Sequence, residues 1–291
     1  MYKRCVITDE ISQDLPAAIA MARHFGLEGV ELRNVWSRRA DQLSGPELDR
    51  VAGLTRDAGL AVAAIAAPCF KCDLGNAEQY REHIGILRAA VRAARALGTP
   101  IVRVFTFWKD RPLELAYREI LAAFAEPIRI AEGEGITLAV ENEASTFIAT
   151  GEQTARFLAD LGSSAVRAIW DPGNAYYDVL RERAYPVGYE AVRDWIVHVH
   201  LKDCATSPET GKLEWVVLGA GEIDIRGQLA ALEADGYEGY VSLETHYRAK
   251  RLPEEALRLP AGEAFSEAGA QATFECLTAW DAMLGRSAGG A

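Results

Sequence analysis

Residues 137–171, TLAVENEASTFIATGEQTARFLADLGSSAVRAIWD, contain two short apolar runs separated by a longer amphipathic stretch. The runs Thr137–Asn142 and Val166–Trp170 are nearly continuous in apolar residues, which is typical of parallel strands covered on both faces. Between them, Thr150–Leu161 carries apolar residues at three- and four-residue spacing and is followed by Gly162, a helix-ending signal. The stretch therefore predicts a strand, a crossover helix and a second, parallel strand.

The same pattern continues in both directions, with a strand about every thirty residues. Eight strands are predicted, at Arg4–Thr8, Gly29–Arg33, Ala61–Ala66, Ile101–Phe107, Thr137–Asn142, Val166–Trp170, Ile196–Lys202 and Tyr240–Thr245. The predicted helices are Asp14–Phe25, Pro46–Ala58, Glu78–Leu97, Leu113–Glu134, Thr150–Leu161, Ile225–Ala234 and Gly262–Leu284. Glycines follow five of them, at Gly26, Gly59, Gly98, Gly135 and Gly162, whereas Tyr176–Tyr189 is predicted to be a long loop. Eight such units favour a closed (β/α)8 TIM barrel of the α/β class, with residues 1–291 as a single domain and 285–291 as a disordered tail.

Composition and charge narrow the range of partners. The chain has 291 residues, 49% of them hydrophobic, and a formal net charge of −11, which argues against nucleic acid or an anionic membrane surface as the main partner. No apolar run of about 18 residues and no signal peptide are recognised, so a cytoplasmic protein is expected. The five cysteines are expected to be reduced. Cys69 and Cys72 have C-x-x-C spacing, but a structural zinc site would need a second pair.

Acidic and imidazole side chains gather at the ends of four consecutive predicted strands. They are Glu141 and Glu143, Asp171 with Asn174, His198 and His200 with Lys202 and Asp203, and Glu244 with His246. In a barrel the carboxyl ends of the strands converge on one mouth. Because clustered buried carboxylates are costly unless a cation neutralises them, three carboxylates and one imidazole are predicted to share one divalent metal ion. Such a site suits Mn²⁺ or Mg²⁺, with Co²⁺ or Zn²⁺ as alternatives.

Alternation along a strand leaves some of these side chains with two interpretations. Glu143 and His246 each follow a candidate ligand by two residues, so they either share its inward side or lie on the next loop. His198 has the same parity as His200 but lies deeper, either behind the metal site or as a core histidine.

Six segments carry a more specific signal: ITDEISQD at 7–14, GVELR at 29–33, VENE at 140–143, WDPGNA at 170–175, HVHLKD at 198–203 and SLE at 242–244. Through them the whole chain resembles the xylose-isomerase-like barrel superfamily of sugar (phosphate) isomerases and epimerases. The resemblance implies Glu141, Asp171, His200 and Glu244 as the metal ligands. From the ketose 3-epimerases of this superfamily it also implies that Glu141 and Glu244 lie on opposite faces of the sugar and exchange a proton.

The implied chemistry is removal of a proton beside a carbonyl, giving an enediolate that the cation stabilises. The sequence departs from the ketose 3-epimerases at Asn174, where they carry a histidine, and at Lys202 and Asp203, where they have small and acidic residues. The His-x-His-x-Lys-Asp run looks more like the inosose dehydratase and hydroxypyruvate isomerase-like branches. Lys202 is therefore a candidate catalytic residue that pairs with a substrate oxyanion or donates a proton. Alternatively, it forms a salt bridge with Asp203 or Glu141.

Further side chains are candidates for substrate contact: Asn174, His198, Asp203, Glu143, Arg103, Trp108 and Glu10. Arg103, in the fourth predicted strand, either reaches the pocket or pairs with Glu31. Phe107 and Trp108 form either an apolar wall against a sugar ring or part of the core or rim. The glycine-rich segment Leu218–Glu222 is a weak phosphate motif and is expected to shape a loop.

Four functions follow, the first being a divalent-metal-dependent isomerase or epimerase of a sugar-like keto substrate. The second is a lyase or dehydratase acting on a keto-inositol or 3-keto-glycoside, in which a β-hydroxyl or glycosyl group leaves. The third, an AP endonuclease-like DNA repair enzyme, needs a three-zinc cluster with additional histidines, and Asn174 and the acidic charge argue against it. The fourth is a non-catalytic sugar-binding barrel. Similar proteins suggest a homodimer or homotetramer.

Overall fold

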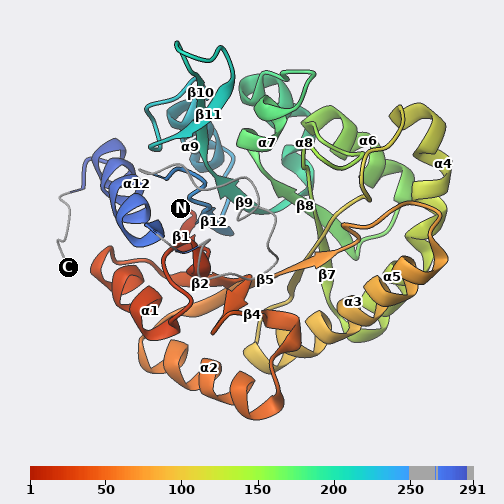
Figure 1. Ribbon diagram of the computed structural model, residues 1–291, viewed down its shortest axis with the longest axis horizontal. Helices are drawn as coiled ribbons and strands as arrows, with labels where there is room; N and C mark the ends of the chain where they lie inside the picture. Colours follow the sequence, from red (N-terminus) through yellow and green to blue (C-terminus); the bar gives the residue numbers. More distant parts are fainter. Residues whose placement is uncertain (249–265, 267, 287–291) are drawn as a thin grey trace.

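A sheet of parallel strands forms the centre of the molecule in the computed structural model, which describes residues 1–248, 266 and 268–286 (Figure 1). The strands are β1 (Lys3–Val6), β2 (Gly29–Leu32), β5 (Ala61–Cys69), β6 (Ile101–Val104), β7 (Thr137–Glu141), β8 (Val166–Trp170), β9 (Ile196–Leu201) and β12 (Tyr240–Leu243). They are hydrogen-bonded in the order β1–β12–β9–β8–β7–β6–β5–β2. A parallel bridge between Ile7 and Glu31 joins the two ends of this order. The prediction of a single-domain (β/α)8 TIM barrel is confirmed.

Helices surround the sheet (Figure 1). They are α1 (Leu15–His24), α2 (Gly45–Asp57), α3 (Ala77–Leu97), α4 (Leu113–Ala123), α5 (Ala125–Glu134), α6 (Gly151–Leu161), α7 (Pro172–Tyr177), α8 (Tyr189–Val192), α9 (Ile225–Ala234) and α12 (Gly269–Met283). The first and last, α1 and α12, are neighbours, with the rings of Phe25 and Phe274 5.1 Å apart. In the described part of the chain, no helix combines the length and the apolar character needed to span a membrane.

Local sequence signals start and end the helices. Ser44 and Glu47 form a capping box at the start of α2, in which each side chain accepts from the other's backbone amide. The Thr150 side chain accepts a hydrogen bond from the Gln153 amide at the start of α6. The glycines predicted to end helices all have φ between 57° and 72°, a region that glycine adopts without steric cost: Gly26, Gly59, Gly98, Gly135 and Gly162.

The predicted helix Leu113–Glu134 is divided into α4 and α5, so the prediction of one continuous helix is wrong. Pro127 lacks an amide hydrogen, and in a continuous helix its ring would clash with the carbonyl of Ala123, four residues earlier. The chain accordingly breaks at Phe124. The Ala123 carbonyl instead accepts a hydrogen bond from the Tyr80 hydroxyl at 2.7 Å.

The bounds of two strands differ from those predicted. β5 continues to Cys69, three residues further than expected, whereas β6 ends at Val104 and leaves Phe105–Phe107 on the following loop. This difference matters for the site, because Phe105 lies beyond the end of the strand and lines the cavity at the mouth of the barrel.

Other predictions concern the loop after β8 and the C-terminal part of the chain. Within the predicted loop Tyr176–Tyr189, the first two residues end α7, Ala184–Gly188 form a kinked turn in which Tyr185 has extended backbone angles, and Tyr189 begins α8. Of the predicted helix Gly262–Leu284, residues 262–265 and 267 lie outside the described residues. In the predicted disordered tail, Gly285 and Arg286 hydrogen-bond to the last turn of α12, and the remainder lies outside the described residues.

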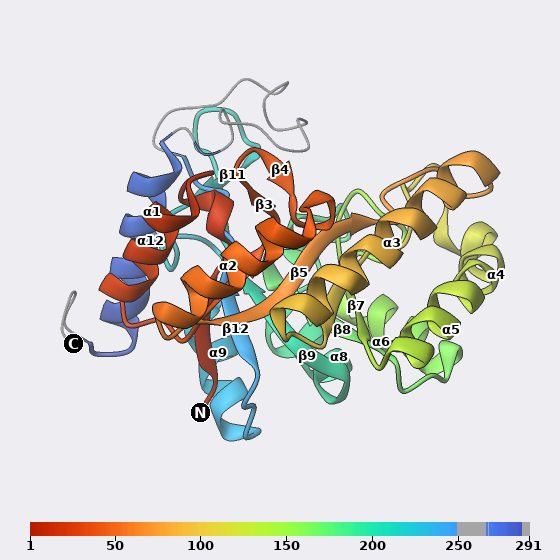
Figure 2. The same ribbon diagram turned by 90° about the horizontal axis from the view of Figure 1, so that it is seen from below.

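Two antiparallel hairpins add walls at the carboxyl ends of the barrel strands. β3 (Asn34–Val35) pairs with β4 (Arg38–Arg39), and β10 (Asp203–Thr206) pairs with β11 (Leu213–Val216). Figure 2 shows β3, β4 and β11 at the end of the barrel opposite the N-terminus. This is the mouth at which active sites of such barrels lie.

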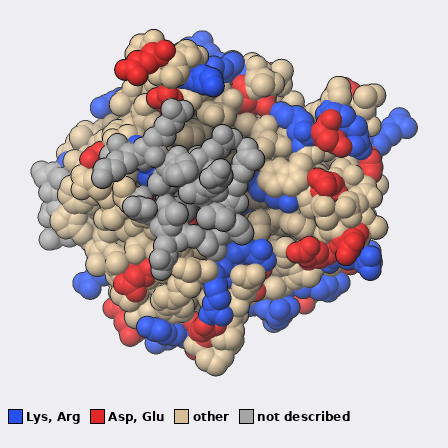
Figure 3. Space-filling view, in the orientation of Figure 1, with Lys and Arg blue, Asp and Glu red and all other residues tan. Residues whose placement is uncertain are grey.

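The remaining composition-based expectations concern charge and thiols. On the described part of the face in Figure 3, basic and acidic side chains are interspersed. All five cysteines are free and buried. Burial raises the pKa of the Cys72 thiol to about 12, which leaves it protonated at neutral pH. The C-x-x-C pair therefore has the character of core side chains.

Candidate metal centre

Four neighbouring strands each deliver one ionisable side chain to the same point at the mouth. Glu141 is the last residue of β7, His200 lies near the end of β9, and Asp171 and Glu244 directly follow β8 and β12. One ligand atom from each lies within 4.8 Å of the others, and all four residues are buried. Asp171 is also the N-cap of α7, where its Oδ1 accepts from the Asn174 amide at 2.9 Å. The structure thus brings together the four predicted ligands.

The imidazole of His200 is held from behind and faces three carboxylates in front. Its Nε2 lies 3.1 Å from both carboxylate oxygens of Glu31. Its Nδ1 lies 3.4 Å from Glu141 Oε1, 3.7 Å from Glu244 Oε2 and 3.8 Å from Asp171 Oδ2, without a hydrogen-bond partner. When Nε2 donates to Glu31, Nδ1 presents a lone pair to three carboxylates. This buried arrangement of donors is consistent with a site for a divalent cation.

Glu31 was missed as a functional residue at the sequence level. It lies inside β2, is fully buried, and also accepts from His198 Nε2 at 2.8 Å. His198 therefore lies behind the site and does not line the cavity. This position agrees with the first of its two predicted interpretations. The available signal was an acidic residue inside the otherwise apolar strand GVEL. A carboxylate that fixes the tautomer of a ligating histidine is a common partner of metal sites.

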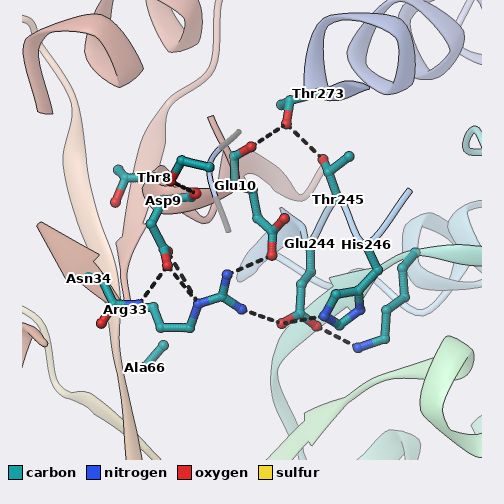
Figure 4. Close-up of polar contacts among 12 residues, drawn as sticks. Thr8, Asp9, Glu10, Arg33, Asn34, Ala66, Glu244, Thr245, His246 and Thr273 are labelled. Carbon is teal, nitrogen blue, oxygen red and sulfur yellow. Dashed lines mark hydrogen bonds and ion pairs between the residues drawn. The ribbon is translucent and has the colours of Figure 1, made fainter. Parts of the chain in front are cut away.

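Arg33 is a second residue that sequence reasoning missed, and it connects the site to the turn Thr8–Glu10 that follows β1 (Figure 4). Its guanidinium donates to Asp9 at 3.0 Å, to Glu10 at 2.6 Å and to Glu244 at 3.1 Å. Glu10, predicted to contact substrate, is instead buried between Arg33 and Arg248, whose Nη2 lies 2.7 Å from it. Arg33 thereby fixes the position of the Glu244 carboxylate.

The connected network carries an excess of negative charge. Among the residues that the structure describes, its carboxylates are Asp9, Glu10, Glu31, Glu141, Asp171 and Glu244. Its permanent cations, within the described residues, are Arg33, Arg103, Lys202 and Arg248. Counted over these described residues, six acids against four bases leave two negative charges when the imidazoles are neutral. A divalent cation matches that excess, so both the donor set and the charge fit one.

The pKa values report the same imbalance. Burial lowers the pKa of His200, but the Glu31 and Glu141 carboxylates outweigh it and raise this pKa well above its ordinary value. Burial, with help from Glu244 and Glu141, raises the pKa of Asp171 to about 6 against the lowering effect of Lys202. Burial also opposes ionisation of Glu244, but Lys202 and other cations hold its pKa well below the usual range. The same negative field that favours a proton on His200 attracts a metal ion.

Lys202 and Arg103 pair differently from the predicted salt bridges. The Lys202 ammonium lies 2.7 Å from Asp171 Oδ2 and 2.5 Å from Glu244 Oε2, and therefore pairs with neither Asp203 nor Glu141. Arg103 donates to Glu141 Oε2 at 3.1 Å rather than pairing with Glu31. In both cases the partner depends on how neighbouring strands are aligned with each other, and the sequence alone does not show that alignment.

Asp203 is occupied by the glycine-rich loop. Its carboxylate accepts from the amides of Gly219 and Gly221 at 2.9 Å each and of Ile223 at 3.3 Å. A side chain on Gly221 would meet Asp203 Oδ1 at 2.1 Å, which explains glycine at that position. The predicted substrate contact by Asp203 is not supported, because the carboxylate shapes this loop and lies outside the large cavity.

A cavity of about 1200 Å³ opens beside the carboxylates. Of the residues predicted to contact substrate, Asn174, Arg103, Glu143 and Trp108 line it. Asn174 Nδ2 donates to Glu141 Oε1 at 3.1 Å. Burial would raise the pKa of Glu143, but the Lys71 ammonium outweighs it and brings this pKa to about 2.

Phe107 and Trp108 were predicted either to form an apolar wall against a sugar ring or to belong to the core or rim, and the structure places them differently. Phe107 is buried in the core, with its ring 5.8 Å from that of Phe70, whereas Trp108 lines the cavity. Phe105, which the sequence did not single out, lines it as well.

Glu31→Gln should lower the affinity for Mn²⁺ by about 10- to 100-fold, the range found when a carboxylate behind a metal-binding histidine is removed. The amide keeps the shape but no longer fixes His200 Nε2 through a charge. Titration of metal-free protein with Mn²⁺, followed calorimetrically, measures the change. Glu28→Gln, three residues earlier and outside the site, serves as the control. Wild-type affinity in Glu31→Gln would remove the proposed orienting role.

Comparison with known proteins gives a family match and partial relatives. A family model described as xylose isomerase-like TIM barrel matches residues 19–273. An inosose dehydratase from Serratia proteamaculans (strain 568) is 26% identical over 141 residues, covering 44% of this chain and 47% of that protein. The chain thus spans about half the length of the curated relatives it matches.

Two solved structures share the fold. A xylose isomerase-like TIM barrel protein from Mycobacterium smegmatis, in complex with magnesium, is 16% identical with a TM-score of 0.68, covering 94% of this chain and 98% of that one. The 3-keto-D-glucoside 4-epimerase YcjR from E. coli is 17% identical with a TM-score of 0.66, covering 94% of this chain and 99% of that one. At these identities the likeness shows the fold alone.

Proposed function

Because the chain belongs to the xylose isomerase-like TIM barrel family, we propose that it is a divalent-metal-dependent isomerase or epimerase of a sugar-like keto substrate. The observation that carries this proposal is the convergence of Glu141, Asp171, His200 and Glu244, with ligand atoms within 4.8 Å of one another. The cluster lies beside a cavity that is large enough for a sugar. The names of similar proteins, an inosose dehydratase and a 3-keto-D-glucoside 4-epimerase, also support an enzyme that acts on a sugar-like substrate.

The four residues would hold one ion, with Mn²⁺ or Mg²⁺ preferred for this oxygen-rich set. A bound cation would supply positive charge that stabilises the negative charge developing on the substrate oxygen during proton removal. The rest of the chemistry belongs to side chains of this protein.

Glu141 and Glu244 are the proposed proton-transfer pair. They come from β7 and β12, which are separated in the sheet by β8 and β9, and both line the cavity. Glu141 is held by Arg103 at 3.1 Å and Asn174 at 3.1 Å, and Glu244 by Arg33 at 3.1 Å. One carboxylate removes the proton beside the substrate carbonyl and the other returns a proton to the substrate. Because the two carboxylates are held in fixed positions on opposite sides of the cluster, they suit removal of a proton from one face of the substrate and its return to the other face.

Lys202 supports the second candidate function, a dehydratase or other lyase on a keto-inositol or 3-keto-glycoside. Its ammonium is buried between Asp171 and Glu244 and lines the cavity, where it could protonate a departing hydroxyl or glycosyl oxygen. The similarity to inosose dehydratases favours this alternative over the remaining ones. The two reactions share their first step and differ in whether a group then leaves the substrate.

The distinguishing experiment uses the Mn²⁺-loaded protein and a panel of keto-sugars, keto-inositol and 3-keto-glycosides in heavy water. We expect deuterium to enter next to the carbonyl, with an isomer or epimer as product and no loss of water or aglycone, as read by NMR. Elimination of water or release of the aglycone would instead establish the lyase. Absence of both exchange and elimination across the panel contradicts the proposed enzyme function.

A further inference from the structure

Resting on the proposed function, we propose that the substrate is an unphosphorylated glycoside, with its keto-sugar ring at the carboxylate cluster and a second ring in an outer aromatic subsite. The cavity measures about 1200 Å³. Pockets for whole drug-sized ligands are typically about 300–1,000 Å³, so a single sugar ring would leave much of this cavity unused. The side chains that line the cavity indicate what kind of group the rest of the ligand carries.

The charges on the walls argue against a phosphate. Within the described residues, every cationic side chain that lines the cavity is ion-paired with a carboxylate: Arg33, Arg39, Lys71, Arg103, Lys109 and Lys202. Phosphate binding relies on Arg and Lys donors that are available to the phosphate oxygens. Here a dianionic group would compete with fixed carboxylates at each of these positions. The lining therefore favours a neutral, hydroxyl-bearing ligand.

Aromatic side chains flank the carboxylate cluster on two sides. On the Glu141 side, the Arg103 guanidinium lies 4.8 Å from the centroid of Phe105. On the Glu244 side, the Trp215 ring lies 5.1 Å from the ring of His246 and 5.5 Å from the Lys202 ammonium. Both aromatic residues line the cavity. Phe105 is 1% exposed and has Arg103 and Lys71 over its ring, whereas Trp215 is only partly buried. Trp215 is therefore the aromatic face of this inner part that can pack against a sugar ring.

Each wall continues outward with a second, more exposed ring. Tyr177 stacks on Trp215 with centroids 4.8 Å apart and planes at 13°, and is 41% exposed. Lys71 lies 4.3 Å from the Phe105 centroid and 5.5 Å from that of Trp108, which is 37% exposed. The Lys71 charge is neutralised by Glu143. The outer part of the cavity therefore combines aromatic surface with charged side chains that are paired with one another, as Lys71 is with Glu143 and Lys109 with Asp178.

Trp108 is held in place although its ring is exposed. Its amide donates to the Cys72 carbonyl at 2.9 Å, and its backbone forms an antiparallel bridge with Thr146. The next amide, of Lys109, donates to the Ser145 carbonyl at 3.0 Å. An exposed aromatic ring on a fixed backbone at a cavity mouth is a pre-organised binding surface. Trp108 is thus the residue on which the second ring of a glycoside is expected to lie.

The test measures binding of unreactive glycosides to the Mn²⁺-loaded full-length protein by isothermal titration calorimetry. Phenyl β-D-glucopyranoside should bind about tenfold more tightly than methyl β-D-glucopyranoside, the size of one added aromatic contact. Trp108→Ala should abolish this ratio and leave the affinity for the methyl glucoside and for Mn²⁺ unchanged. Trp108→Phe should retain most of the ratio. Glucose 6-phosphate should bind no more tightly than glucose.

Equal affinities of the two glucosides for the wild-type protein would overturn the aromatic subsite, as would an unchanged ratio in Trp108→Ala. Tighter binding of glucose 6-phosphate than of glucose would overturn the assignment of an unphosphorylated substrate. Because these ligands do not react, the outcome is independent of turnover. A preserved ratio without any deuterium exchange on keto-sugars would reject the proposed reaction and leave the glycoside site standing.

Discussion

Glu141→Gln and Glu244→Gln should each lower kcat by at least about 10²–10⁴-fold, because each removes one of the two carboxylates proposed to exchange a proton with the substrate. Glutamine keeps the size of the side chain and one oxygen donor, but it cannot accept a proton at neutral pH. The ion pairs of Glu141 with Arg103 and of Glu244 with Lys202 and Arg33 are weakened in the same step. Deuterium exchange at saturating Mn²⁺ is the appropriate measurement, since it separates proton transfer from loss of metal.

Asp203→Asn is the matched comparison for these two variants. Asp203 follows the same strand as His200, but its carboxylate holds the Gly219 and Gly221 amides instead of facing the cavity. Its replacement should cost less than tenfold in kcat, the size expected for a modest loop adjustment rather than for lost acid–base chemistry. Exchange at the wild-type rate in either glutamate variant would be incompatible with the two-carboxylate mechanism.

Removal of the metal should abolish turnover and lower the free energy of unfolding. A ligand that binds only the folded state stabilises it by about 2.7 kcal/mol at 100 times its Kd. Here the gain arises because the cation offsets the negative charge shared by Glu141, Asp171 and Glu244. Chelator-treated protein should regain both activity and stability on addition of Mn²⁺ or Mg²⁺, as measured by exchange assays and by chemical unfolding.

Asp171→Asn provides the control for this stabilisation. The variant loses one charged ligand while its backbone and its cap on α7 can be retained, so its metal-free stability should be close to that of the wild type. Its gain on adding Mn²⁺ should be much smaller. An equal gain in both proteins would mean that the ion binds elsewhere and would reject the assigned ligand set.

Much of the fold could be predicted from sequence because its signals are local. The apolar runs and the helix-ending glycines around residues 137–171 are sufficient to give one β-α-β unit, and repetition gives the barrel. The break before α5 was missed because the helical periodicity continues across Pro127, although the proline itself prevents an unbroken helix. The hairpin β10–β11 was missed because its strands are short and lie in a segment without strong alternation.

The candidate site could be predicted only in part. Residues at strand ends were identified because barrel topology alone brings strand ends together. Glu31 and Arg33 were missed because their significance depends on partners from distant strands, His200 at 3.1 Å and Glu244 at 3.1 Å. The direction in which the Asp203 side chain points could not be predicted either, because a residue beyond the end of a strand no longer follows the alternation of that strand. Long-range pairing of side chains, rather than their identity, is what the sequence could not provide.

Glu31 serves two structural roles at once. Its backbone bridges to Ile7 where the first and last strands of the sheet order meet, and its side chain holds His200. A fluctuation that opens this seam would also free the imidazole from its orienting carboxylate. In the metal-loaded protein proposed above, retention of the ion and closure of the barrel would therefore be coupled through this one residue, and a bound ion would stabilise the junction between β1 and β2 behind it.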